Sequence, residues 1–70
     1  MNQAIANLIN KLAKETKGSL EDIKLVTEKE FEREGYTGKH SYFIYLSNLT
    51  VDKVKEFLNF LYVSREFRYL

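Results

Sequence analysis

The chain has 70 residues with a formal net charge of +1, from eleven basic and ten acidic side chains, and 44% of its residues are hydrophobic. Seventy residues allow one domain, whose core rarely supplies more than roughly 3–5 kcal/mol of net stability. The absence of cysteine excludes disulfides, and the single histidine, His40, cannot form a zinc site alone. The near balance of charge argues against a dedicated nucleic-acid protein.

The sequence has neither the apolar segment of a signal peptide nor a run long enough to span a membrane. We therefore expect a cytoplasmic protein with a single small domain over residues 1–70 and no membrane partner.

Residues 3–16 predict an amphipathic helix. Ile5, Ile9 and Leu12 recur at helical spacing, with polar side chains on the opposite side. Gly18 is placed to end this helix as a left-handed residue.

Residues 22–26 predict a short strand, because Ile23 and Leu25 lie on one face of an extended segment. The competing interpretation is a helix that starts at Ser19 with Asp22 as a capping partner. The strand is preferred because a second helix start follows directly.

That second start predicts a two-turn helix near 28–34. Thr27 is its expected N-cap, with a glutamate three residues later to complete a capping box. Gly35 lies where a left-handed residue ends a helix, and a contact between Tyr36 and Phe31 would complete a Schellman motif.

Residues 40–47 are the clearest predicted strand, because they contain five consecutive apolar or aromatic side chains. Thr50 is the expected N-cap of a helix that runs from about 51 to at least 65. The expected fold is therefore a small two-layer α/β (α+β) domain with the order α-β-α-β-α. Its two-stranded sheet would be packed by the N- and C-terminal helices and extended by a dimer partner, because two strands alone are marginal.

The last helix has apolar residues on two sides. One set faces the expected core: Val51, Val54, Phe57, Leu58, Leu61 and Tyr62. The second set is spaced i, i+3, i+7 and i+10: Phe60, Val63, Phe67 and Leu70. A helix that is apolar nearly all round is either buried or paired, and a large exposed apolar patch usually marks an interaction site.

We therefore predict that the second set, flanked by Arg65 and Arg68, binds a protein partner. Two alternatives stay open from the sequence. The first helix and the sheet could cover this side, or the chain could break near Ser64 and fold Phe67 back into the core.

The sequence offers little for catalysis. His40 is the one conventional base, and its neighbour Ser41 would point to the opposite face of a strand. Glutamates alternate with other residues over 28–34, but cations interleave with them, which indicates a solvated charged face rather than a metal site. We expect a protein that is not an enzyme and that has no cofactor.

A nucleic-acid-binding accessory protein is the alternative function. Lys39, His40, Tyr42 and Tyr45 combine basic and aromatic side chains on the predicted strand 39–45, as in sheets that stack single-stranded bases. Arg65 and Arg68 would add phosphate contacts.

The leading hypothesis is a small regulator or inhibitor that occupies a protein surface through its C-terminal helix. We expect it to form a homodimer, and its small size suits a stand-alone accessory factor of a phage or mobile element. Aromatic and arginine side chains are the usual anchors of such interfaces.

Overall fold

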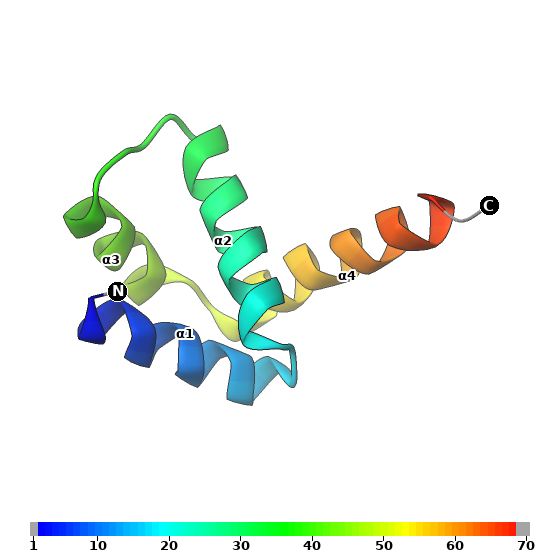
Figure 1. Ribbon diagram of the computed structural model, residues 1–70, viewed down its shortest axis with the longest axis horizontal. Helices are drawn as coiled ribbons and strands as arrows, with labels where there is room; N and C mark the ends of the chain where they lie inside the picture. The colour runs from blue at the N-terminus through cyan, green and yellow to red at the C-terminus, as the bar shows by residue number, and fades with distance from the viewer. Residues whose placement is uncertain (1, 69–70) are drawn as a thin grey trace.

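Helices account for all of the regular structure between residues 2 and 68 (Figure 1). The computed structural model describes the backbone of residues 2–68 and the side chains of residues 2–65. The four helices are α1 (Gln3–Thr16), α2 (Leu20–Arg33), α3 (Lys39–Asn48) and α4 (Val51–Arg68). No strand occurs within residues 2–68. The predicted α/β domain with its two-stranded sheet is therefore wrong, and the fold is all-α.

Helix α1 confirms the helix predicted over residues 3–16. The side-chain oxygen of Asn2 accepts hydrogen bonds from the backbone N–H groups of Ala4 (2.8 Å) and Ile5 (3.4 Å), which caps the first turn. The helix ends on Lys17, whose φ is +61°, and not on a left-handed Gly18. Gly18 is needed for space, because a Cβ there would lie only 2.9 Å from a methyl of Leu58 in α4.

Helix α2 replaces the predicted strand 22–26 and starts where the competing interpretation placed it. The hydroxyl of Ser19 accepts a hydrogen bond from the backbone N–H of Asp22 at 3.1 Å. Thr27 is not an N-cap, because it lies in the middle of this helix and is fully buried. Its hydroxyl lies 2.7 Å from the carbonyl oxygen of Ile23, so it is satisfied within the helix.

The predicted end of this helix is confirmed. Gly35 has a φ of +86°, and its N–H donates to the carbonyl of Glu32 at 2.9 Å. The N–H of Tyr36 donates to the carbonyl of Phe31 at 3.3 Å, and the two rings lie 5.8 Å apart between centroids. These contacts form a Schellman motif, at the end of a fourteen-residue helix rather than a two-turn one.

Helix α3 replaces the predicted strand 40–47. Tyr42 and Leu46, one turn apart, are buried against the core, whereas Ile44 is 46% exposed. The aromatic run suits a helix here because α3 packs on both α1 and α2. Thr50 then caps α4 as predicted, since its hydroxyl accepts the backbone N–H of Lys53 at 3.1 Å.

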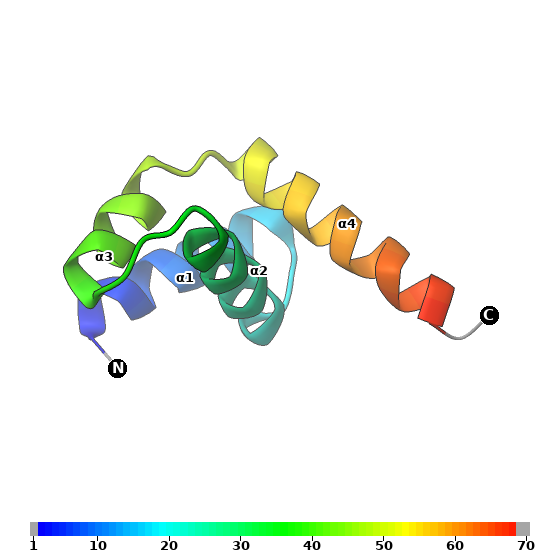
Figure 2. The ribbon, with the colours of Figure 1, turned by 90° about the horizontal axis from the view of Figure 1, so that it is seen from above.

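The core lies where the inward faces of all four helices meet. Its apolar members are Ile5, Ile9, Leu12, Ala13, Ile23, Val26, Phe31, Tyr42, Leu46, Val54 and Leu58. Helix α4 contacts both α1 and α2, and its C-terminal part extends away from α1 and α3 while it stays joined to the start of α2 (Figures 1 and 2). Because α4 continues through Ser64 to Arg68, the alternative in which the chain breaks near Ser64 is wrong.

Candidate functional site

Two members of the predicted partner-binding set are exposed on α4. Phe60 is 77% exposed, the largest value among the large hydrophobic side chains that the structure describes, and Val63 is 41% exposed. Both lie in the C-terminal half of α4, which extends away from α1 and α3 (Figure 1). Neither α1 nor any other described element buries these two side chains. The alternative in which the first helix and a sheet cover this side of the last helix is therefore wrong for Phe60 and Val63.

The remaining members are placed differently. The side chains of Phe67 and Arg68 and the whole of Leu70 lie outside the described residues. Arg65 has an intramolecular partner, because its guanidinium donates to a carboxylate oxygen of Asp22 at 3.1 Å. The hydroxyl of Tyr62 donates to the other oxygen of the same carboxylate, also at 3.1 Å. Arg65 therefore ties the outer part of α4 to the start of α2.

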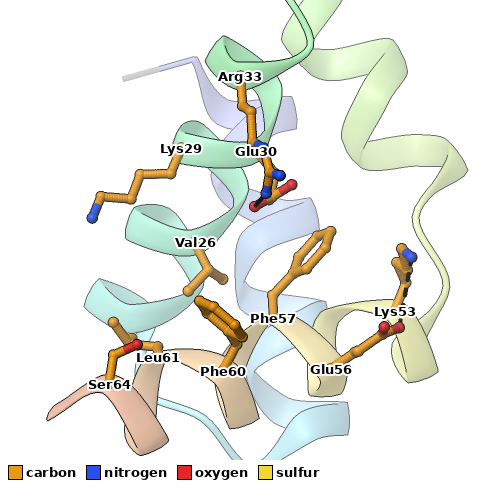
Figure 3. Close-up of a pocket in the computed structure, with 10 residues that line it drawn as sticks. All are labelled: Val26, Lys29, Glu30, Arg33, Lys53, Glu56, Phe57, Phe60, Leu61 and Ser64. Atoms are coloured by element: carbon orange, nitrogen blue, oxygen red, sulfur yellow. Dashed lines mark hydrogen bonds and ion pairs between the residues drawn. The ribbon is translucent and has the colours of Figure 1, made fainter. Parts of the chain in front are cut away.

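A groove of about 400 Å³ lies between α2 and α4, beside Phe60. Its apolar lining comes from Val26 on α2 and from Phe57, Phe60 and Leu61 on α4, which gather where the two helices face each other (Figure 3). Ser64 lines it with a small side chain. An apolar groove between two helices is a common docking site for a third helix.

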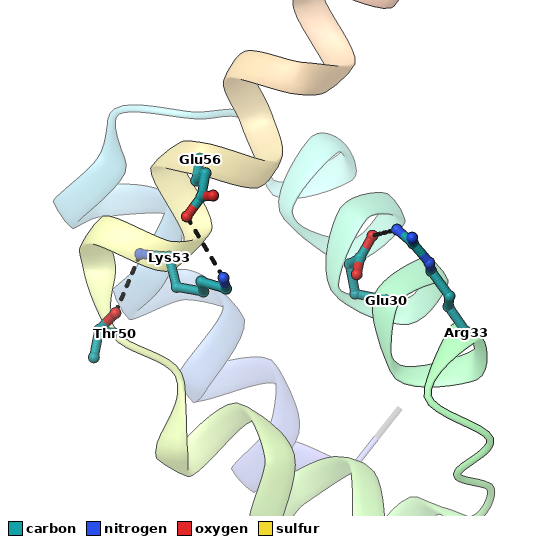
Figure 4. A network of polar contacts seen from close by, with 5 residues as sticks. All are labelled: Glu30, Arg33, Thr50, Lys53 and Glu56. Atoms are coloured by element: carbon teal, nitrogen blue, oxygen red, sulfur yellow. Dashed lines mark hydrogen bonds and ion pairs between the residues drawn. The ribbon is translucent and has the colours of Figure 1, made fainter.

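The charged side chains around the groove are largely neutralised by their own neighbours (Figure 4). Glu30 pairs with Arg33 on α2 at 3.4 Å, and Lys53 pairs with Glu56 on α4 at 3.6 Å. Such exposed pairs add little stability, but they cancel charge on each wall. Lys29 is the one lining residue with a charge that has no ion pair among the described side chains, so the groove carries a net charge of about +1.

The residues of the nucleic-acid alternative do not form a stacking surface. Lys39 and His40 are exposed in the first turn of α3, whereas Tyr42 is buried and its hydroxyl lies 2.6 Å from that of Thr27. Burial raises the pKa of Tyr42, and the Thr27 hydrogen bond lowers it in part. Tyr45 is half-buried, with its ring 5.5 Å from that of Phe31. The predicted basic and aromatic strand is therefore wrong, and its tyrosines contribute to packing between α2 and α3.

The α2 wall of the groove was missed from the sequence. Val26, Lys29 or Glu30, and Arg33 follow the i, i+3 or i+4, i+7 spacing of one helix face. The prediction of a strand followed by a separate short helix divided this face in two. A continuous helix from the Ser19 cap to the Gly35 stop would have placed these residues together.

Within residues 2–68, none of the helices is both long and apolar enough to cross a membrane. The described side chains contain no group of three or more potential metal ligands. Neither a family model, nor a curated protein, nor a solved structure matches the chain, so the function is inferred from the site alone.

Proposed function

We propose that this protein is a non-enzymatic interaction module that regulates or inhibits a partner by binding one of its helices. The binding surface is the Phe60 face, defined as the exposed residues Phe60 and Val63 together with the groove between α2 and α4. The observation that carries the proposal is a phenyl ring 77% exposed beside an apolar groove.

The exposed ring of Phe60 presents apolar surface that the fold does not bury. Burying a phenylalanine side chain gains about 2 kcal/mol, and in the free protein Phe60 leaves most of this unrealised. Phenylalanine is enriched at the buried centres of interfaces, and the groove next to it would let a partner exclude water from both. Binding would therefore recover burial that the fold itself does not provide.

A helix is the partner element that fits best. Phe60 and Val63 occupy the first a and d positions of a heptad, and the sequence continues that spacing at residues 67 and 70. Knobs at this spacing pack against the side of another helix. The groove adds the second wall of a helix-in-groove arrangement.

The test uses the absence of cysteine, which makes a single introduced thiol unique. A benzophenone maleimide is attached to Phe60→Cys and, as the matched control, to Ile44→Cys on α3. Both native residues are exposed hydrophobics. After irradiation in an extract of the source cells, each captured protein is identified, purified and titrated directly with the wild-type chain.

We expect position 60 to capture a protein that position 44 does not. The purified partner should bind the wild type, and its Kd should rise at least about tenfold for Phe60→Asp. Equal capture at both positions, or equal affinity for wild type and Phe60→Asp, would show that the Phe60 face is not the binding surface.

A further inference from the structure

We propose that the Phe60 face binds a second copy of this chain, with each Phe60 entering the groove of the other copy about a two-fold axis. This inference rests on the proposed function, because it names one occupant of the same face. Three properties of the face favour a copy over a different protein.

The first property is self-complementarity. A two-fold interface uses the same patch on both subunits, so the patch must carry both a projecting part and a receiving part. Phe60 projects, and the groove lined by Val26, Phe57 and Leu61 lies directly beside it. The apolar ring of one copy therefore matches the apolar lining of the other.

The second property is charge. Each wall carries an internally paired cation and carboxylate, Glu30 with Arg33 on α2 and Lys53 with Glu56 on α4. Two such faces therefore bring only one uncompensated charge each, that of Lys29, into the contact, and the chain as a whole carries only +1. A strongly acidic partner would find only Lys29 uncompensated, and a strongly basic one would find no free carboxylate among the groove's described residues.

The third property is shape. The second half of α4 extends away from α1 and α3 (Figures 1 and 2). An axis perpendicular to α4 near Phe60 makes the two copies of α4 antiparallel and puts α1 and α3 of each copy at opposite ends of the pair, while α2 stays beside the contact as the wall of the groove.

The amount of apolar surface sets the expected strength. Phe60 and Val63 together expose on the order of 200 Å², whereas a standard interface buries about 800 Å² on each partner. Even with the groove lining added, the contact is small, and we expect a weak dimer whose dissociation constant lies well above about 1 µM. A dimer this weak leaves the face accessible to a competing target helix.

Sedimentation equilibrium of the full chain from roughly 5 to 500 µM tests the inference. The wild type should shift from monomer to dimer across this range, and Phe60→Asp should weaken the association at least about tenfold. Ile44→Asp is the matched control, because it places the same charge at an exposed apolar residue on α3 and should dimerise like the wild type. Far-ultraviolet circular dichroism confirms that each variant is folded.

A wild type that stays monomeric at the highest concentration overturns the inference, as does a folded Phe60→Asp that dimerises like the wild type. These results are distinct from a failure of the proposed function. A monomeric chain whose position 60 still captures a different protein keeps the function and loses the second copy. A dimer that depends on Phe60, with no other protein captured there, keeps the second copy and removes the regulatory role.

Discussion

Phe60 and Leu58 lie two residues apart on α4 in opposite environments. Leu58 is 4% exposed and belongs to the core, whereas Phe60 is 77% exposed. A large apolar side chain kept in water contributes little to folding, and one that lies beside an apolar groove extends that groove into a larger apolar patch, which is typical of an interaction site. The proposed interface would bury this patch.

A matched pair of truncations separates the two roles. Leu58→Ala should lower the free energy of unfolding by about 2–5 kcal/mol, because it leaves a cavity in the core. Phe60→Ala should change it by no more than about 0.5 kcal/mol. Urea unfolding at about 1 µM, well below the expected dimer dissociation constant, measures both. A large loss for Phe60→Ala at this concentration would mean that Phe60 supports the monomer fold.

The raised pKa of Tyr45 predicts that the protein loses stability at alkaline pH. Burial, together with the charges of Glu34 and Glu30, raises its pKa from 10.0 to about 12. The folded chain binds the phenolic proton of Tyr45 more tightly than the unfolded chain does. The resulting contribution to the free energy of unfolding is therefore fully present below pH 10 and is lost as the pH rises through about 12.

We therefore expect the free energy of unfolding to fall between pH 10 and about 12. Tyr45→Phe should flatten this fall, because it removes the titrating group and keeps the ring. Urea titrations followed by circular dichroism at several pH values in this range provide the comparison. An unchanged slope in Tyr45→Phe would show that other groups cause the alkaline loss.

At the scale of single elements, the end of α2 depends on one backbone conformation. Gly35 has a φ of +86°, and a Cβ there would meet nothing within 4 Å. Gly35→Ala should therefore cost about 1–2 kcal/mol through backbone strain alone. Gly35→Asn should cost less, because asparagine tolerates the left-handed region. Thermal unfolding of the two variants ranks them, and an equal loss in both would argue against strain at this φ.

The sequence predicted α1 from apolar residues at helical spacing, and it predicted α4 from the same kind of spacing together with the Thr50 N-cap. It failed for α2 and α3, where the same residues satisfy two patterns. Ile23 and Leu25 fit one face of a strand, yet Ile23 is fully buried and Leu25 is exposed on the same helix. In α3 the apolar residues surround the helix, because it packs on two neighbours and still leaves Ile44 in solvent.

In α2, the local signals that were correct came from the two ends of the helix. The Ser19 cap and the Gly35 stop are both read from single residues, and together they enclose all of α2. Short apolar runs cannot distinguish a strand from a buried helix by spacing alone. The tertiary contacts that decide between a strand and a helix cannot be read from a short apolar segment alone.

At the scale of the whole molecule, α4 combines a buried part and an exposed part in one element. Its first half completes the core through Val54 and Leu58, and its second half carries Phe60 and Val63 into solvent. The pairing of Asp22 with Tyr62 and Arg65 attaches the outer half to α2 and keeps the groove beside Phe60. The exposure of Phe60 could be predicted from the sequence of α4 alone. The groove could not be predicted, because its other wall belongs to α2, which the sequence analysis divided into a strand and a short helix.

The most direct test of the Phe60 face is an intermolecular nuclear Overhauser effect. A one-to-one mixture of isotopically labelled and unlabelled chain is examined at a concentration where the dimer is populated. We predict contacts between the ring protons of Phe60 in one copy and the methyl protons of Val26 in the other. A dimer that shows contacts between copies elsewhere and none to Phe60, or a chain that shows none at all, would contradict this account.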